Sequence, residues 1–200
     1  MATATEPEYR PFPNDERRNA RQASLELPMM VRALGLPTGG RVLEVGCGRG
    51  VALPGLARLL RPSWLAGLDI EPAFLAEARA RLDAEGIAAE LVPGDMRRMP
   101  FAHASFDLVV DFGTCYHIDR PAAALAEIAR VLVPGGLFVH ETPVSQILSH
   151  PVRGFGRRLP WGRFECFQRQ RTAVLWSVRR RRVFGERGGD KVIGAFGFVL

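Results

Sequence analysis

The chain has 200 residues, of which 47% are hydrophobic and 24% are charged, a composition ordinary for a soluble globular protein. This length accommodates about one domain with a full core, and no uninterrupted apolar stretch is long enough to span a membrane. The formal net charge is +6, but residues 151–200 hold 12 of the 27 basic and only 3 of the 21 acidic residues, so the positive charge belongs to the C-terminal part.

The cysteines and the N-terminus indicate the compartment. Cys47, Cys115 and Cys166 share no C-x-x-C spacing, so the sequence suggests neither a disulfide framework nor a zinc site. The N-terminus carries Glu6 and Glu8 and lacks the basic and then apolar layout of a signal peptide. We therefore expect a cytoplasmic protein without a metal site.

The first regular element that the sequence predicts is a helix. Residues 1 to about 14 contain three prolines and are expected to form an irregular arm. Asn14 or Asp15 can cap the helix that follows, and Gly35 lies near its end. Its expected apolar face consists of Leu25, Leu27, Met30, Val31 and Leu34.

A short apolar strand followed by three glycines comes next. Residues 42–45 are typical of a buried parallel strand, and Gly46, Gly48 and Gly50 follow at every second position. Residues 51–60 then resume the apolar spacing of a helix. Glycines at a strand end allow positive φ and close approach of a ligand to the backbone, and the helix N-terminus beyond them favours negative charge. The segment therefore predicts a nucleotide-type site.

The spacing of the glycines distinguishes between cofactor loops. A dinucleotide-binding loop reads G-x-G-x-x-G, but the last position counted from Gly46 is Val51. A P-loop is excluded because no G-K-[ST] follows, and the only lysine of the chain is Lys191. The remaining pattern places Glu44 two residues before the first glycine.

The second and third predicted strands also end in carboxylates. Asp69 follows the apolar residues 64–68 at a position where a doubly wound sheet ends its second strand, so it can accept both hydroxyls of a ribose or cap the helix near Pro72. Asp95 follows a third strand at 89–93 and is positioned to accept from an adenine amino group, with Met96 against the ring. A Gly-Asp pair is also a common turn.

The fourth strand, at 106–110, ends in Asp111, and a helix at 121–133 leads through a Pro-Gly-Gly turn to a fifth strand that ends in His140 and Glu141. Four strands thus deliver polar residues to one edge of the sheet. Repetition at successive strand ends is stronger evidence than any single motif.

The pattern Glu44-x-Gly46-x-Gly48-x-Gly50 resembles the first motif of the class I S-adenosylmethionine-dependent methyltransferases, and the Pro-Gly-Gly passage resembles the branch that includes ubiquinone and menaquinone biosynthesis enzymes. The resemblance covers about residues 41–141. It implies S-adenosyl-L-methionine as cofactor, with Glu44 suited to the methionine ammonium. The cofactor-binding residues that it implies are Glu44, Gly46, Cys47, Gly48, Gly50, Asp69, Ile70, Asp95, Met96 and Asp111. Whether Asp111 contacts the cofactor or the substrate stays open.

The resemblance also implies a fold and a division of the chain. The fold class is α/β, a doubly wound and mostly parallel seven-stranded sheet with an antiparallel C-terminal hairpin, whose strands we expect at 173–178 and 192–199. We expect one methyltransferase domain over residues 1–200. Residues 1–37 are its arm and cap helix, 41–141 its cofactor-binding core, and 142–200 its substrate side and closing strands.

Methyl transfer from a sulfonium requires mainly that the nucleophile, the methyl carbon and the sulfur are held in line, and such positioning supplies about 7 to 11 kcal/mol. The candidate catalytic residues are His117 and Tyr116, after the fourth strand. His117 is as consistent with a hydrogen-bonded structural role as with a base. For His140 we expect a structural role, and for Cys115 a packing role.

The sequence therefore predicts a methyltransferase acting on a small organic acceptor. One alternative is an RNA or protein methyltransferase that uses the arginine-rich C-terminal segment, although a solvated basic face explains that segment as well. Another alternative is a non-catalytic module that binds S-adenosylmethionine. The acceptor and the oligomeric state do not follow from the sequence.

Overall fold

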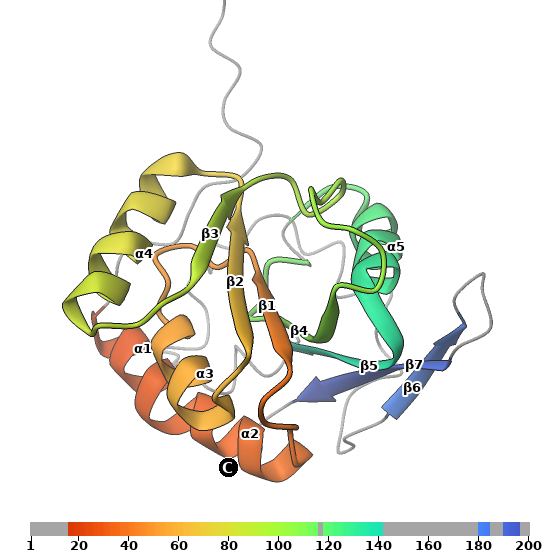
Figure 1. Ribbon diagram of the computed structural model, residues 1–200, viewed down its shortest axis with the longest axis horizontal. Coiled ribbons are helices and arrows are strands. Elements are labelled where there is room, and N and C mark those ends of the chain that lie inside the picture. Colours follow the sequence, from red (N-terminus) through yellow and green to blue (C-terminus); the bar gives the residue numbers. More distant parts are fainter. Residues whose placement is uncertain (1–15, 116–117, 142–179, 185–189, 197–200) are drawn as a thin grey trace, which may run out of the picture.

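The computed structural model describes residues 16–115, 118–141, 180–184 and 190–196. A sheet with the strand order β3-β2-β1-β4-β5-β7-β6 forms its centre (Figure 1). The strands are β1 (Arg41–Val45), β2 (Trp64–Asp69), β3 (Glu90–Pro93), β4 (Phe106–Asp111), β5 (Leu132–Glu141), β6 (Arg180–Phe184) and β7 (Asp190–Phe196). The helices are α1 (Glu16–Arg21), the π-helix η1 (Gln22–Glu26), α2 (Leu27–Leu34), α3 (Leu53–Leu60), α4 (Pro72–Ala84) and α5 (Pro121–Val131).

Strands β1 to β5 are all parallel. β1 pairs with β2 on one side and with β4 on the other, β3 adds to β2, and β5 adds to β4. The chain therefore winds outward in one direction through β2 and β3 and then returns to wind in the other. In such sheets, ligands bind outside the carboxyl ends of the strands at the point where the direction changes, here between β1 and β4. The predicted Rossmann-like parallel sheet is confirmed.

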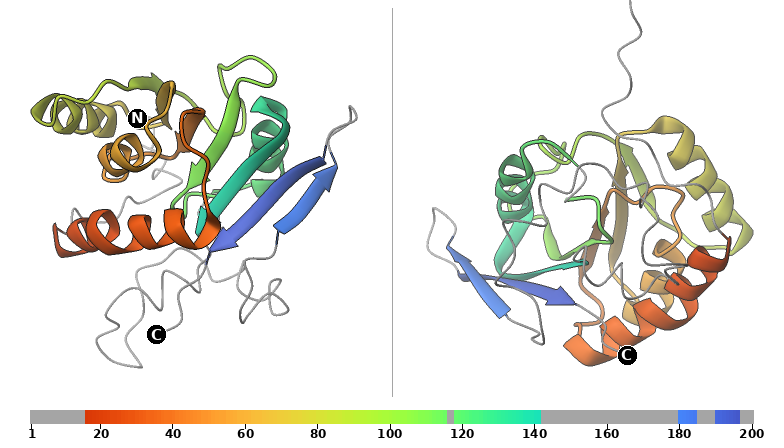
Figure 2. Two further views of the ribbon diagram at one scale, coloured as in Figure 1. Left: turned by 60° about the horizontal axis from the view of Figure 1, so that its bottom comes forward. Right: turned by 180° about the vertical axis from the view of Figure 1, so that it is seen from behind.

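Helices cover both faces of this parallel part. α2, α3 and α4 lie on one side and α5 on the other (Figure 2). Alternate residues of β1 divide between the two layers: Val42 packs into the core with Leu27 and Leu53, whereas Leu43 packs with Ile128 of α5. This alternation is the period of two that a strand imposes, and it explains why the strands carry apolar residues on both faces.

Leu25, expected on the apolar face of its helix, and Leu125, in the helix predicted at 121–133, are both exposed, and helix geometry explains each. Leu25 is 46% exposed because it lies in the π-helical turn η1, whose wider turn shifts the apolar stripe expected from a regular α-helix. Leu125 is 41% exposed because α5 turns Ala124 and Ile128 inward, four residues apart. The predicted end of α2 is confirmed by Gly35, whose φ of 57° makes it a left-handed cap.

Beyond β5 the sheet continues with β7, which pairs in parallel with β5, and β6, which pairs antiparallel with β7. The strand expected at 173–178 lies outside the described residues, so the seven-stranded sheet with its closing hairpin stays a prediction. Within the described part of the chain, no helix combines the length and the apolar character needed to cross a membrane.

An aromatic cluster closes the core at the amino edge of the sheet and yields a test of the fold. Phe106 is fully buried, stacks on Trp64 at a centroid distance of 4.6 Å and meets Phe101 edge to face at 4.9 Å. We expect Phe106→Ala to lower the free energy of unfolding by about 3–5 kcal/mol, because it removes this packing and leaves a cavity. Leu125→Ala should change it by less than about 0.5 kcal/mol. Urea unfolding measures both, and equal effects would contradict this packing.

Candidate cofactor site

The glycine loop after β1 is held to its neighbours by its own backbone. The Cys47 N–H donates to the Leu68 carbonyl at 3.0 Å, and the Gly48 N–H donates to the Asp69 carboxylate at 2.7 Å. On the other side, the Thr114 hydroxyl donates to the Gly46 carbonyl at 3.4 Å. The loop is thus fastened to the end of β2 and to the turn after β4, so its shape is fixed without a ligand.

Two glycines of this loop serve different purposes. Gly46 has a φ of 64°, and a Cβ there would overlap the side chain of Thr114, so the position requires glycine for packing. Gly48 has a φ of 51°, but a Cβ there would meet no atom within 4 Å among the described residues. The backbone at Gly48 therefore faces open space, as a loop that lies against a ligand requires.

Glu44 is one of the two almost fully buried acids among the predicted ligand residues. Its side chain is 3% exposed, and its Oε2 atom is buried without a hydrogen-bond partner among the described residues. Burial raises the pKa of Glu44 well above its usual value, and the charges of Asp69 and Asp111 raise it further. The surrounding residues therefore disfavour the charged form of this carboxyl, and a cation or a donor that reached it would favour that form.

Asp69 is held in place at the end of β2. One carboxylate oxygen accepts from Gly48 and the other accepts from the Glu71 N–H at 2.9 Å. Burial raises its pKa, and these backbone hydrogen bonds oppose the rise. The alternative role for Asp69, capping α4, is filled by Glu71, which accepts from the Ala73 N–H at 3.3 Å. Each oxygen of Asp69 accepts one backbone N–H and has a lone pair left for a hydroxyl donor.

Asp95 follows β3, and its carboxylate forms an ion pair with Arg97, a residue that the sequence analysis missed. Both of its oxygens accept from Arg97 Nε, at 3.0 and 2.9 Å, and Arg97 also pairs with Asp119. The Arg97 guanidinium holds the pKa of Asp95 below its usual value. The sequence signal for this pairing is the arginine two residues after Asp95. An aspartate in a turn often accepts from the backbone N–H two residues later, and the Arg97 N–H does donate to Asp95 at 2.8 Å.

The remaining predicted residues divide between core and surface. Met96 and Cys47 are buried in the core, whereas Ile70 is 63% exposed beside Asp69. Gly50 has a φ of 68°, and a Cβ there would come within 2.8 Å of Ala78, so α4 packs closely against it. The candidate catalytic residues Tyr116 and His117 lie outside the described residues.

Asp111 is buried at the end of β4 and organises the turn that follows. Its oxygens accept from the Thr114 N–H at 2.6 Å and the Cys115 N–H at 3.1 Å. Burial raises its pKa, whereas the nearby His140 lowers it. Thr114, which links this turn to Gly46, is a second residue that sequence reasoning missed, because no motif marks it.

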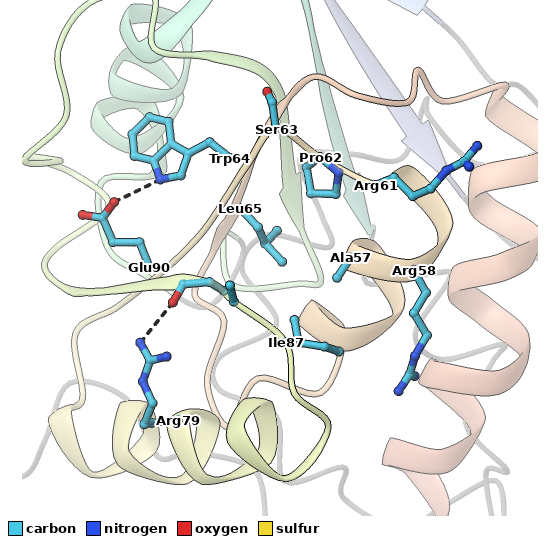
Figure 3. A pocket seen from close by; sticks show the side chains of 12 residues that line it. Ala57, Arg58, Arg61, Pro62, Ser63, Trp64, Leu65, Arg79, Ile87 and Glu90 are labelled. Atoms are coloured by element: carbon cyan, nitrogen blue, oxygen red, sulfur yellow. Dashed lines mark hydrogen bonds between the residues drawn. The ribbon is translucent and has the colours of Figure 1, made fainter.

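A separate pocket opens at the opposite edge of the sheet. It lies at the amino ends of β2 and β3, where the Trp64 Nε1–H donates to Glu90 at 3.0 Å and Arg79 donates to the Ala89 carbonyl at 3.0 Å (Figure 3). None of the predicted cofactor residues lines it. This pocket is therefore separate from the polar strand ends at the carboxyl edge.

This carboxyl edge fits an adenosine that carries an amino acid. Glu44 is a buried carboxyl with an unpartnered oxygen, suited to an ammonium group, and Asp69 retains acceptor capacity for hydroxyls. Gly48 leaves the backbone open between the two.

Comparison with known proteins agrees with this geometry. Residues 43–140 match the family model described as "Methyltransferase domain". This part of the chain is a methyltransferase domain of the class I, S-adenosylmethionine-dependent family, and its cofactor is S-adenosylmethionine.

Among curated relatives, the chain is similar to a fatty-acid O-methyltransferase of Mycolicibacterium smegmatis, with 40% identity over 51% of this chain and 36% of the relative. It is also similar to a phthiotriol/phenolphthiotriol dimycocerosates methyltransferase of Mycobacterium leprae, with 38% identity over 50% of this chain and 36% of the relative. The matched segment spans only about a third of these relatives.

Among solved structures, an S-adenosylmethionine-dependent methyltransferase from Aquifex aeolicus superposes with a TM-score of 0.53. The identity is 22%, and the match covers 57% of this chain and 62% of that one. This likeness supports the fold.

The difference between the glycines can be measured. Gly86, which follows α4, has a φ of 63°, and a Cβ there meets no atom of a described residue within 4 Å, so it matches Gly48 in both respects. We expect Gly48→Ala and Gly86→Ala each to cost about 1–2 kcal/mol of stability through left-handed strain. Only Gly48→Ala should also weaken binding of S-adenosylhomocysteine, by at least about tenfold. Calorimetry with both variants at the same fraction of folded protein separates the loss of stability from the loss of affinity. An equal loss of affinity in both variants would contradict this site.

Glu44 yields a prediction about pH. Because its folded pKa is raised, the folded state binds this proton more tightly than the unfolded state, and stability falls as pH rises from about 4.3 through the folded pKa. We expect Glu44→Gln to be more stable than the wild type at neutral pH and to flatten this fall. The same variant should bind S-adenosylhomocysteine more weakly. Urea unfolding from pH 4 to 9 tests this, with exposed Asp83→Asn as the control; a less stable Glu44→Gln at pH 8 would refute it.

Proposed function

We propose that the protein is an S-adenosylmethionine-dependent methyltransferase that transfers a methyl group to a small organic acceptor of the lipid type. The observation that carries the proposal is the buried Oε2 atom of Glu44, which has no hydrogen-bond partner among the described residues and precedes the glycine loop of a methyltransferase domain. The names of the relatives, a fatty-acid and a phthiotriol methyltransferase, support a lipid acceptor.

In this proposal the chain's residues bind and orient the cofactor. Glu44 accepts from the methionine ammonium and Asp69 from the ribose hydroxyls. The adenine lies between exposed Ile70 and the turn at Asp95 and Met96, where the Arg97 pair must leave an acceptor free for the amino group. Gly46, Cys47, Gly48 and Gly50 supply the backbone surface, and Asp111 borders the methyl end. S-adenosylmethionine supplies an activated methyl group, so alignment is the main requirement.

The finer sequence predictions belong to the same proposal. Tyr116 and His117 are proposed to line the acceptor side, with His117 as a base if the acceptor is protonated. One domain over 1–200, the closing hairpin and a cytoplasmic location complete it. The ubiquinone and menaquinone branch stays a prediction.

Two alternatives give different results in solution. If the arginine-rich C-terminal segment recruits RNA or protein, affinity for that substrate falls steeply with salt. If the domain is a non-catalytic module, it binds S-adenosylmethionine and turns over no acceptor.

The cofactor assignment is tested by binding. We expect S-adenosylhomocysteine to bind more tightly than NAD or ATP, and Asp69→Ala to weaken its binding at least about tenfold, or about 1.4 kcal/mol, because both ribose contacts are lost. Exposed Asp83→Ala on α4 is the control and should bind as the wild type does. Calorimetry measures all of these affinities.

Equal or tighter binding of NAD would overturn the cofactor assignment. Turnover is then measured with labelled S-adenosylmethionine on fatty acids, hydroxylated lipids and RNA at two salt concentrations. Binding without turnover of any acceptor would favour the non-catalytic module instead.

A further inference from the structure

Two ionisable residues meet where the proposed acceptor site begins. Asp111 ends β4, and its partner in the register of the adjacent strand β5 is His140. Side chains of partners in a parallel pair point to the same face of the sheet, here the face that α5 covers, because Val109 and Phe138 two residues earlier pack into that layer. The two groups therefore lie side by side at the carboxyl edge.

The position of this pair relative to the cofactor residues assigns it to the acceptor side. The groups proposed for adenosine, Asp69 and Asp95, end β2 and β3 on one side of β1. Strands β4 and β5 lie on the other side of β1. If the adenosine lies over the ends of β2 and β3, the ends of β4 and β5 are the side of β1 that is left for the acceptor.

The ring of His140 is fixed in orientation but has a buried nitrogen without a hydrogen-bond partner among the described residues. Its ring stacks on Phe138 at a centroid distance of 5.5 Å and an interplanar angle of 11°, which fixes its orientation. Its Nδ1 atom is buried and makes no hydrogen bond to any described residue, although the residue as a whole is half-buried. A purely structural histidine normally has a hydrogen-bond partner for a buried nitrogen.

Asp111 is held in a fixed position beside this ring. The backbone N–H groups of Thr114 and Cys115 donate to its two oxygens and oppose the cost of burying it. The attraction between the carboxylate and the imidazole lowers the pKa of Asp111 against the larger effect of burial. A positive charge that forms on His140 would be stabilised where it arises.

We propose that His140 takes the proton of a hydroxyl acceptor, with Asp111 as its positioning residue, and that the acceptor is therefore an alcohol or phenol of a lipid rather than a carboxylic acid. The inference rests on the proposed function. The O–H bond breaks as its proton passes to the imidazole, the oxygen's electron pair forms the new bond to the methyl carbon, and the carbon–sulfur electron pair leaves with sulfur. The imidazolium later releases the proton to solvent.

The choice of a hydroxyl follows from proton chemistry. A fatty acid is ionised at neutral pH, since carboxyl groups titrate near 4, and needs no base. An alcohol or phenol must lose a proton during the transfer. A general base is most effective for this step when its pKa lies near the working pH, and imidazole is the side chain of that kind. The two kinds of relative, one named for a fatty acid and the other for a triol, correspond to these cases.

Other charged groups facing the pair are few. Glu44 lies on the opposite face of the sheet and interacts electrostatically with Asp111. The Cys115 thiol bonds to Asp111, and burial keeps its pKa high, so it stays protonated. From α5, apolar Ala124 and Ile128 face this layer. His117 and the Glu141 side chain lie outside the described part of the chain.

A double-mutant cycle tests the pair without any ligand. Unfolding midpoints are measured for the wild type, Asp111→Asn, His140→Gln and the double variant at pH 6 and pH 9. We expect the two substitutions to be non-additive, with a coupling that differs between the two pH values, because an interaction between two ionisable groups depends on their charge. Additive effects at both pH values would overturn the pairing, because a packing role does not depend on charge.

Turnover tests the proton transfer. A long-chain alcohol, an alkylphenol and a fatty acid of equal chain length are offered to the full chain with S-adenosylmethionine. We expect the hydroxyl acceptors to be methylated and His140→Gln to lower their kcat about 100-fold or more with little change in KM, together with loss of the acidic limb of the pH profile. Exposed His103→Gln, in the loop before β4, is the matched control and should keep wild-type rates.

The outcomes separate this inference from the proposed function. Methylation of the fatty acid alone, or a His140→Gln kcat within about threefold of the wild type, would overturn the inference and leave the methyltransferase assignment intact. Failure of S-adenosylhomocysteine to bind the wild type would overturn the proposed function itself, while the ligand-free cycle would still decide whether Asp111 and His140 are coupled.

Discussion

The hydrogen bond from the Gly48 N–H to the Asp69 carboxylate, 2.7 Å long, is the contact on which the site depends. It joins the loop after β1 to the end of β2 and holds Gly48 at a positive φ. With the Thr114 hydroxyl on the other side, it fixes the loop that follows β1 and the buried Glu44. A loop without these ties would be free to move onto this carboxyl, because its Oε2 atom has no hydrogen-bond partner among the described residues and attracts any nearby donor.

The site gathers three acids in a small volume, and this arrangement opposes folding. Glu44 and Asp111 are almost fully buried, and the charges of Asp69 and Asp111 act on Glu44. Backbone N–H groups stabilise Asp69 and Asp111, but Oε2 of Glu44 has no partner in the described part of the chain. Buried acids without full compensation destabilise a core, and such residues are often found at binding sites. At Glu44, a cationic ligand would supply the missing compensating charge.

The sequence predicts the parallel half of the fold well because its signals are local. Apolar runs and glycines mark β1, β2 and the turn between strand and helix without knowledge of distant contacts. The features that the sequence did not predict depend on distant contacts or on irregular backbone. Leu25 depends on a π-helical turn that no residue type announces, and the occupation of Asp95 by Arg97 depends on how a turn folds back on itself. The C-terminal strands lack such signals because they depend on pairing with β5.

The two halves of the site differ in what determines them. The cofactor half consists largely of main chain and carboxylates at the ends of β1 to β3, so many sequences can build it, and relatives with different acceptors share it. The acceptor half depends on side chains that end β4 and β5, where Asp111 and His140 stand in register. A single residue there decides whether a proton can be removed before the methyl group moves. The choice of acceptor can therefore change while the parallel sheet and its glycine loop remain as they are.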